Sequence, residues 1–130
     1  TWHVAVAEAI KQALENKYTV ETLTGIKSTA ERQHIIFKFQ KESDPQILVC
    51  TMASTGTGVT LTAANIAIFA ELDFIPANVV QAQDRIHRIG QKDTCFIYYF
   101  VFQDTLEESI AKKMMRRNRN IQKTLNIQSK

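Results

Sequence analysis

The chain has 130 residues, of which 45% are hydrophobic and 22% charged, a composition typical of globular proteins and sufficient for one buried core. It has no apolar run near the roughly 20 residues that a membrane-spanning helix needs, and its N-terminus lacks a signal-peptide pattern. The formal net charge of +3 is uneven, because residues 109–130 carry seven bases and no acid, whereas residues 1–108 carry nine bases and thirteen acids. Such a basic end indicates a polyanion or an acidic protein surface as neighbour, or simply a solvated helix face.

Hydrophobic spacing predicts helices alternating with strands. Ser28 with Glu31, and Thr105 with Glu108, have the spacing of capping boxes that start helices. In chain order we expect a helix at 1–17, a strand at 18–23, a helix at 29–40, a strand at 46–51, a loop at 52–58, one or two helical turns at 60–65, a strand at 66–71, a helix at 76–90, a strand at 94–102 and a helix from 106.

The three longest strand candidates are apolar throughout, which favours a mainly parallel sheet covered by helices on both faces. Ligands of such sheets bind at the carboxyl ends of the strands. The Thr24-Gly25 turn, the loop at 52–58 and the connection at 73–76 should all meet at that edge. Cys50 and Cys95 lie inside the apolar runs, so we expect reduced, buried thiols and an intracellular protein.

The segment from Gln81 to Gln91 carries the strongest functional pattern. On a helix that ends at Gly90, Gln81, Arg85 and Arg88 would form one polar stripe. Two guanidinium groups on a rigid element suit a phosphate group, which they bind bidentately. Alternatively, Arg85 belongs to a surface helix and pairs with a neighbouring carboxylate. The stripe expected to be buried beside them consists of Val79, Ala82, Ile86 and Ile89.

This segment, Gln-Ala-Gln-Asp-Arg-Ile-His-Arg-Ile-Gly-Gln, resembles the sixth motif of the SWI/SNF-type DNA-dependent ATPases of helicase superfamily two at every fixed position. Residues 51–61 resemble the fifth motif, with Ser54-Thr55 where the family usually has Ala-Gly and Thr60 where most members have Asn. The Gly25, Arg32 and Phe39 spacing is similar to a third family motif. Phe69-Ala70-Glu71-Leu72-Asp73-Phe74, followed by Pro76, is similar to the annealing-helicase, fork-remodelling branch.

The resemblance implies a RecA-like α/β three-layer sandwich, the second lobe of a two-lobe motor, at residues 1–104, followed by a basic helix and tail at 105–130. Because the chain begins directly on a helix, we expect the first strand of that fold to be missing. No Gly-Lys-Ser/Thr phosphate loop occurs in the chain. ATP with Mg²⁺ would therefore be bound mainly by an N-terminal RecA-like lobe of the same protein, and the isolated chain should be an inactive monomer. Its compartment would be the nucleus in a eukaryote, or the cytoplasm in a bacterium or phage.

The resemblance also implies roles for individual residues. Arg88 would be the arginine finger and Arg85 its neighbour on the same phosphates. Cofactor-binding candidates are Gln81, which would order the arginines or contact nucleotide, Gly56 and Gly58, where the backbone could approach closely, and Asp84, which would anchor an arginine. His87 would support the helix through a hydrogen bond, and no metal site is expected. Candidate contacts to the DNA backbone are Thr24, Lys27, Ser28 and Thr51, for which simple turn and cap chemistry is the alternative.

Two competing functions remain. A non-catalytic nucleic-acid or protein docking module could have the same fold, although the retained Arg85 and Arg88 argue against it. An RNA-directed motor of the same superfamily is the other, although the His-Arg-Ile-Gly-Gln ending, residues 87–91, favours the DNA-dependent members.

Overall fold

The computed structural model describes residues 1–56 and 58–128, with side chains as far as Arg117. It confirms the alternation of helices and strands that the hydrophobic spacing predicts. The elements are α1 (Val4–Leu14), β1 (Val20–Leu23), α2 (Thr29–Glu42), β2 (Ile47–Cys50), the 3-10 turn η1 (Met52–Thr55), β3 (Ile66–Phe69), α3 (Pro76–Gln83), β4 (Phe96–Tyr99) and α4 (Leu106–Gln128). No helix of the described residues is long and apolar enough to span a membrane.

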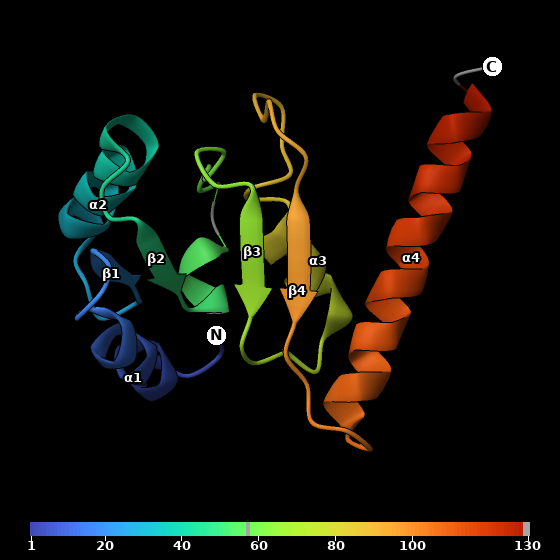
Figure 1. Ribbon diagram of the computed structural model, residues 1–130, viewed down its shortest axis with the longest axis horizontal. Helices are drawn as coiled ribbons and strands as arrows, with labels where there is room; N and C mark the ends of the chain where they lie inside the picture. The colour runs from blue at the N-terminus through green and yellow to red at the C-terminus, as the bar shows by residue number, and fades with distance from the viewer. Residues whose placement is uncertain (57, 129–130) are drawn as a thin grey trace.

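The strands form two parallel pairs rather than one continuous sheet. β1 pairs with β2, Val20 opposite Ile47, and β3 pairs with β4, Ile66 opposite Phe96. The first residues of the chain lie between the two pairs (Figure 1). The Thr1 ammonium group donates to the Cys50 carbonyl at 2.8 Å, and the Met52 N–H donates to the Thr1 carbonyl at 2.8 Å.

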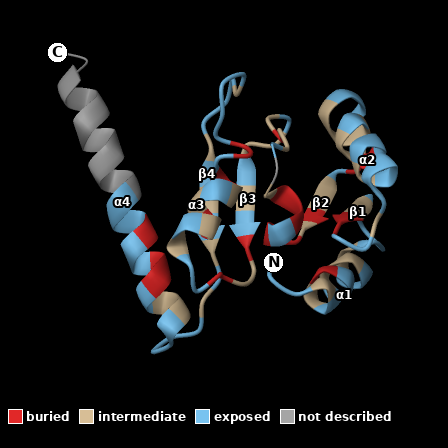
Figure 2. Ribbon diagram, turned by 180° about the vertical axis from the view of Figure 1, so that it is seen from behind, coloured by how far each residue is buried: buried red, intermediate tan, exposed pale blue. Residues whose placement is uncertain are grey.

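The core lies on the face of the β3–β4 pair that α3 covers, and α4, which stands to one side of these elements, contributes residues to it (Figure 2). Its buried residues are Met52, Phe69, Leu72, Val79, Ile110, Ala111 and Met114. The prediction that these strands are covered on both faces is wrong. Ile66, Ile68, Phe96 and Tyr98 are each at least half exposed, because no described helix packs on their side of the pair.

Local polar contacts explain which turns form. The Ser28 capping box is confirmed, with the Glu31 N–H donating to Ser28 Oγ and the Ser28 N–H donating to Glu31 Oε2. The helical turns expected at 60–65 are absent, and a 3-10 turn forms instead in the expected loop at Met52–Thr55. There the Thr55 hydroxyl donates to the Met52 carbonyl at 2.9 Å and closes the turn.

Candidate functional site

Helix α3 ends at Gln83 and not at Gly90, so the prediction of one long helix is wrong. Beyond Gln83 the backbone forms tighter turns, and its carbonyls bond to other segments. The Arg85 carbonyl accepts the Leu61 N–H at 2.9 Å, and the Ile86 carbonyl accepts the Gln91 side chain at 3.1 Å. These tertiary bonds replace the helical ones, and the expected apolar stripe fails at Ile89, which is fully exposed.

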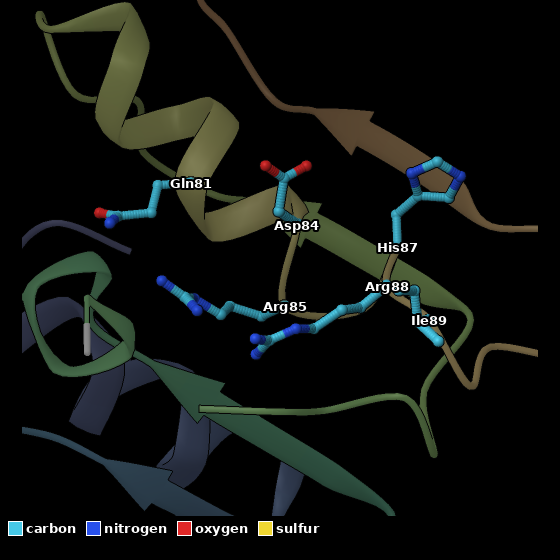
Figure 3. Close-up of a pocket in the computed structure, with 6 residues that line it drawn as sticks. All are labelled: Gln81, Asp84, Arg85, His87, Arg88 and Ile89. Atoms are coloured by element: carbon cyan, nitrogen blue, oxygen red, sulfur yellow. The ribbon is translucent and has the colours of Figure 1, made fainter. Parts of the chain in front are cut away.

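Four of the six predicted catalytic and cofactor-binding residues nevertheless meet at one place, without Gly56 and Gly58. Gln81, Asp84, Arg85, His87, Arg88 and Ile89 line an open pocket. Figure 3 shows the Arg85 and Arg88 side chains extending in the same direction, whereas Asp84 and His87 point away from them. The expected support of a helix by His87 is absent, since its exposed ring makes no described hydrogen bond and α3 ends four residues earlier.

Arg85 is almost completely buried, with 9% of its surface exposed. Its Nη2 donates to the Gly56 carbonyl at 3.2 Å, and its Nε is buried without a hydrogen-bond partner. Within the part of the chain that the structure describes, Arg85 forms no ion pair. Both the surface ion pair considered for Arg85 and the anchoring role expected of Asp84 are therefore wrong.

Arg88 lies three residues further on and is exposed. Its Nη1 donates to the Thr60 hydroxyl at 3.2 Å and lies 3.5 Å from the Gly58 carbonyl. An exposed neutral acceptor holds a guanidinium only weakly, because water competes for the same donor. The Arg88 fork is therefore available to another partner at the surface of this domain.

The loop that contains Gly56 and Gly58, called the glycine loop below, contacts Arg85 and Arg88 through the carbonyl oxygens of these two glycines. Gly58 has a φ of +67°, a conformation that other residues rarely adopt. A Cβ at Gly56 would lie 3.3 Å from the Ala53 carbonyl, so space is tight there as well. The expected approach of this loop to a nucleotide stays a prediction, but the structure adds a role that the sequence did not indicate, since both carbonyls face arginine donors.

The four DNA-contact candidates gather at the carboxyl ends of β1 and β2, as the strand order predicts. The side chains of Thr24 and Thr51 are only 2% and 3% exposed, which leaves them little surface for a direct contact. Ser28 caps α2, and Lys27 lies 3.1 Å from Glu21. Burial alone would raise the pKa of Glu21, but the Thr22 N–H and the Lys27 ammonium outweigh it and hold that pKa below its ordinary value.

Two further side chains shape the site and were not predicted to do so. Arg32 of α2 donates to the Ser54 carbonyl, and the Ser54 hydroxyl lies 2.6 Å from the Leu23 carbonyl. The sequence signal for Arg32 was its spacing from Gly25 and Phe39, which did not indicate which residue Arg32 would contact.

The described residues contain no group of three or more His, Cys, Asp or Glu side chains that could hold a metal ion. Both cysteines are free, and burial raises the pKa of Cys50 to about 12, so this thiol stays protonated at neutral pH. The charged side chains that line the pocket are Asp84, Arg85 and Arg88.

Parallel strands joined by helices, with a glycine loop and paired arginines beside their carboxyl ends, define a RecA-like helicase lobe. Residues 1–90 match the helicase conserved C-terminal domain, and the chain belongs to this family as the C-terminal lobe of a SWI/SNF-type superfamily-two protein. It is 34% identical over 125 residues to the DNA annealing helicase and endonuclease ZRANB3 of Homo sapiens, covering 95% of this chain and 12% of that protein.

Further relatives agree. The chain is 41% identical over 70 residues to a SWI/SNF-related regulator-of-chromatin subfamily A-like protein 1 homolog of Caenorhabditis elegans, covering 54% of this chain and 10% of that protein. The C-terminal part of the Fun30 ATPase domain superposes with a TM-score of 0.77 at 30% identity, covering 85% of this chain and 36% of that one. The chain thus spans only about a tenth of the curated relatives, and the RecA-like fold expected from the sequence is confirmed.

Proposed function

We propose that this chain is the second motor lobe of an ATP-dependent double-stranded DNA translocase and is inactive without its first lobe. The observation that carries the proposal is the pair Arg85 and Arg88, which reach the same open pocket and form no ion pair with any described carboxylate. Two cations that pair with no described carboxylate, although Asp84 lines the same pocket, fit a site completed by an external polyanion. The relatives named as ATP-dependent helicases support this assignment.

The arginines fit the phosphates of ATP. Phosphoryl transfer spreads negative charge over the γ-phosphoryl oxygens, and an arginine finger that stabilises this charge contributes about 10³- to 10⁵-fold in turnover. Arg88, exposed and weakly bonded, would supply the finger when the two lobes close. Arg85, fixed against Gly56, would provide a second charge, and exposed Gln81 would order the arginines or contact nucleotide.

The described residues hold no carboxylate cluster suited to Mg²⁺, so this ion would be bound by the first lobe together with most of the ATP. When bound, Mg²⁺ neutralises charge on the phosphates. This lobe would contribute the arginine donors, the glycine loop that positions them, and closure of the cleft against water.

DNA contact is proposed at the carboxyl edge of β1–β2. Lys27 and Ser28 stand at the amino end of α2, where backbone N–H groups and a positive charge suit a phosphate oxygen. Thr24 and Thr51 lie buried beneath them and would shape this edge. None of these groups reads base edges, so binding should be independent of sequence and weakened by salt. A parent protein without a phosphate-binding loop would instead favour the non-catalytic docking module.

The test uses the two-lobe protein that contains this chain. Arg88→Ala should lower DNA-stimulated ATP hydrolysis by about 10³-fold or more while DNA affinity stays within a factor of about two. Lys17→Ala, which removes one exposed charge from a distant site, is the control. Normal turnover of Arg88→Ala would remove the finger role, and steady hydrolysis by the isolated 130-residue chain would contradict the half-motor assignment. Comparing stimulation by DNA and by RNA tests the RNA-directed alternative.

A further inference from the structure

Arg32 and Arg85 share an uncommon environment. The Nε atom of each is buried without a hydrogen-bond partner, and these are the two such side-chain atoms found among the described residues. Neither guanidinium forms an ion pair with a described carboxylate. Arg85 is buried and Arg32 is partly buried, and a positive charge withdrawn from water without a paired acid is unfavourable, so the bonds that these groups do make contribute to the structure.

Both guanidinium groups bind the same short turn. Arg32 donates through Nη2 to the Ser54 carbonyl, and Arg85 donates through Nη2 to the Gly56 carbonyl, with one residue between the two acceptors. Arg32 comes from α2, which follows β1, whereas Arg85 follows α3, which packs with the β3–β4 core. The turn is thus held from both halves of the domain.

Hydrogen bonds in and around the turn constrain the segment between the two carbonyls. The Ser54 Oγ lies 2.7 Å from the Thr51 carbonyl as well as close to the Leu23 carbonyl at the end of β1. The Thr55 hydroxyl donates to the Met52 carbonyl. Because the Ser54 and Thr55 side chains are both hydrogen-bonded and buried, we expect a shift of the Ser54 carbonyl to move Gly56 as well.

We propose that Arg32 is a positioning residue of the ATP site, acting on Arg85 through the carbonyls of Ser54 and Gly56. Arg32 does not line the pocket, so it has no direct path to a ligand there. This inference rests on the proposed function for its effect on turnover, but the coupling between the two arginines can be measured in the chain itself.

The first experiment needs no catalysis. Side-chain ¹⁵N NMR of the 130-residue chain would follow the Arg85 Nε–H signal in the unchanged protein, in Arg32→Lys and in Arg32→Met. We expect Arg32→Met, which removes every donor, to shift this signal and speed its exchange with water. Arg32→Lys, which keeps one donor for Ser54, should shift it less. An Arg85 signal unchanged in both variants would overturn the proposal.

The second experiment measures turnover in the two-lobe protein at saturating DNA. Arg32→Met should lower kcat about 10- to 100-fold, the range expected when a catalytic group is misplaced by about 1 Å, with the KM for ATP within twofold. In an Arg85→Ala background the same change should have no additional effect. An additive loss in the double variant would show that Arg32 acts independently and would overturn the proposal.

Two other outcomes would change the interpretation of Arg32 or of the proposed function. If Arg32→Met keeps full kcat but weakens DNA affinity, Arg32 is a DNA contact and the positioning role is wrong. If Arg85→Ala itself leaves turnover unchanged, the proposed function fails, while the NMR comparison still decides the coupling. Thermal unfolding of each variant, with Arg32→Lys as the conservative case, identifies any loss that comes from a smaller folded fraction.

Discussion

Arg85 and Arg88 are three residues apart, yet the fold treats them in opposite ways. Arg85 is 9% exposed and bonded to a backbone carbonyl, whereas Arg88 is exposed and reaches only weak acceptors. Both arginines lie beyond the end of α3 at Gln83, where the Arg85 carbonyl accepts the Leu61 N–H and the backbone between the two arginines is not helical. One arginine is therefore part of the packing of the domain, and the other stays at its surface, where the proposed function needs it.

The largest expected effect separates the two arginines by stability. Arg85→Ala should reduce the free energy of unfolding of the chain by about 1–3 kcal/mol, because the buried Arg85 side chain is removed and the partly buried Gly56 carbonyl loses its donor. Arg88→Ala should change it by less than about 0.5 kcal/mol, as surface substitutions usually do. Urea unfolding of both variants checks this. If both variants lose the same free energy of unfolding, the difference in burial between Arg85 and Arg88 does not affect stability.

The glycine loop offers the next test. Gly58→Ala should destabilise the chain by about 1–2 kcal/mol, since its φ of +67° is strained for any residue with a Cβ. Gly25→Ala is the matched control, because a Cβ there meets nothing within 4 Å. In the two-lobe protein Gly58→Ala should also lower kcat, since its carbonyl lies beside Arg88. If Gly58→Ala is as stable as Gly25→Ala, the backbone at residue 58 is not strained by a Cβ.

The same region shows where sequence reasoning succeeds and where it stops. One short-range signal was reliable: Ser28 and Glu31 form the predicted capping box because both partners lie within one turn. Gln81, Asp84, Arg85 and Arg88 line one pocket because they belong to one continuous segment, whereas the predicted Gly56 and Gly58 do not line it. The end of α3 was not predicted, since it depends on the Leu61 N–H, a partner more than twenty positions earlier in the chain.

The prediction that both faces of β3 and β4 are buried was wrong for a related reason. An apolar run predicts burial on both sides, but whether Ile66 and Ile68 are covered depends on a packing partner that local sequence does not specify. Likewise, Arg32 was visible only as part of a spacing, and its bond to Ser54 depends on how α2 and η1 meet in space. The sequence therefore indicated that Arg32 belongs to a motif, but it did not indicate that Arg32 contacts Ser54.

A smaller effect concerns Glu21, whose carboxylate pairs with Lys11 and Lys27. The pKa of Glu21 is lowered in the folded chain, so the stability that its carboxylate contributes is present above its ordinary pKa of about 4.5 and is lost as the pH falls through the lower, folded value. Glu21→Gln should therefore weaken the loss of stability below about pH 4.5. Urea unfolding at pH 7 and pH 3.5 measures this. An identical pH dependence in both proteins would mean that other groups govern it.

The smallest effect should come from Thr60, whose hydroxyl accepts the Arg88 Nη1 at 3.2 Å. Thr60→Val removes this acceptor and keeps the shape, so kcat in the two-lobe protein should fall about two- to fivefold, in line with one exposed hydrogen bond of about 0.5–1 kcal/mol. Thr60→Ser, which keeps the hydroxyl, should retain most of kcat. If Thr60→Val matches the unchanged protein, Arg88 needs no support from its own domain, and its position in the closed state is set entirely by the opposing lobe. A fall as large as that of Arg85→Ala would instead mean that the exposed arginine is held as firmly as the buried one.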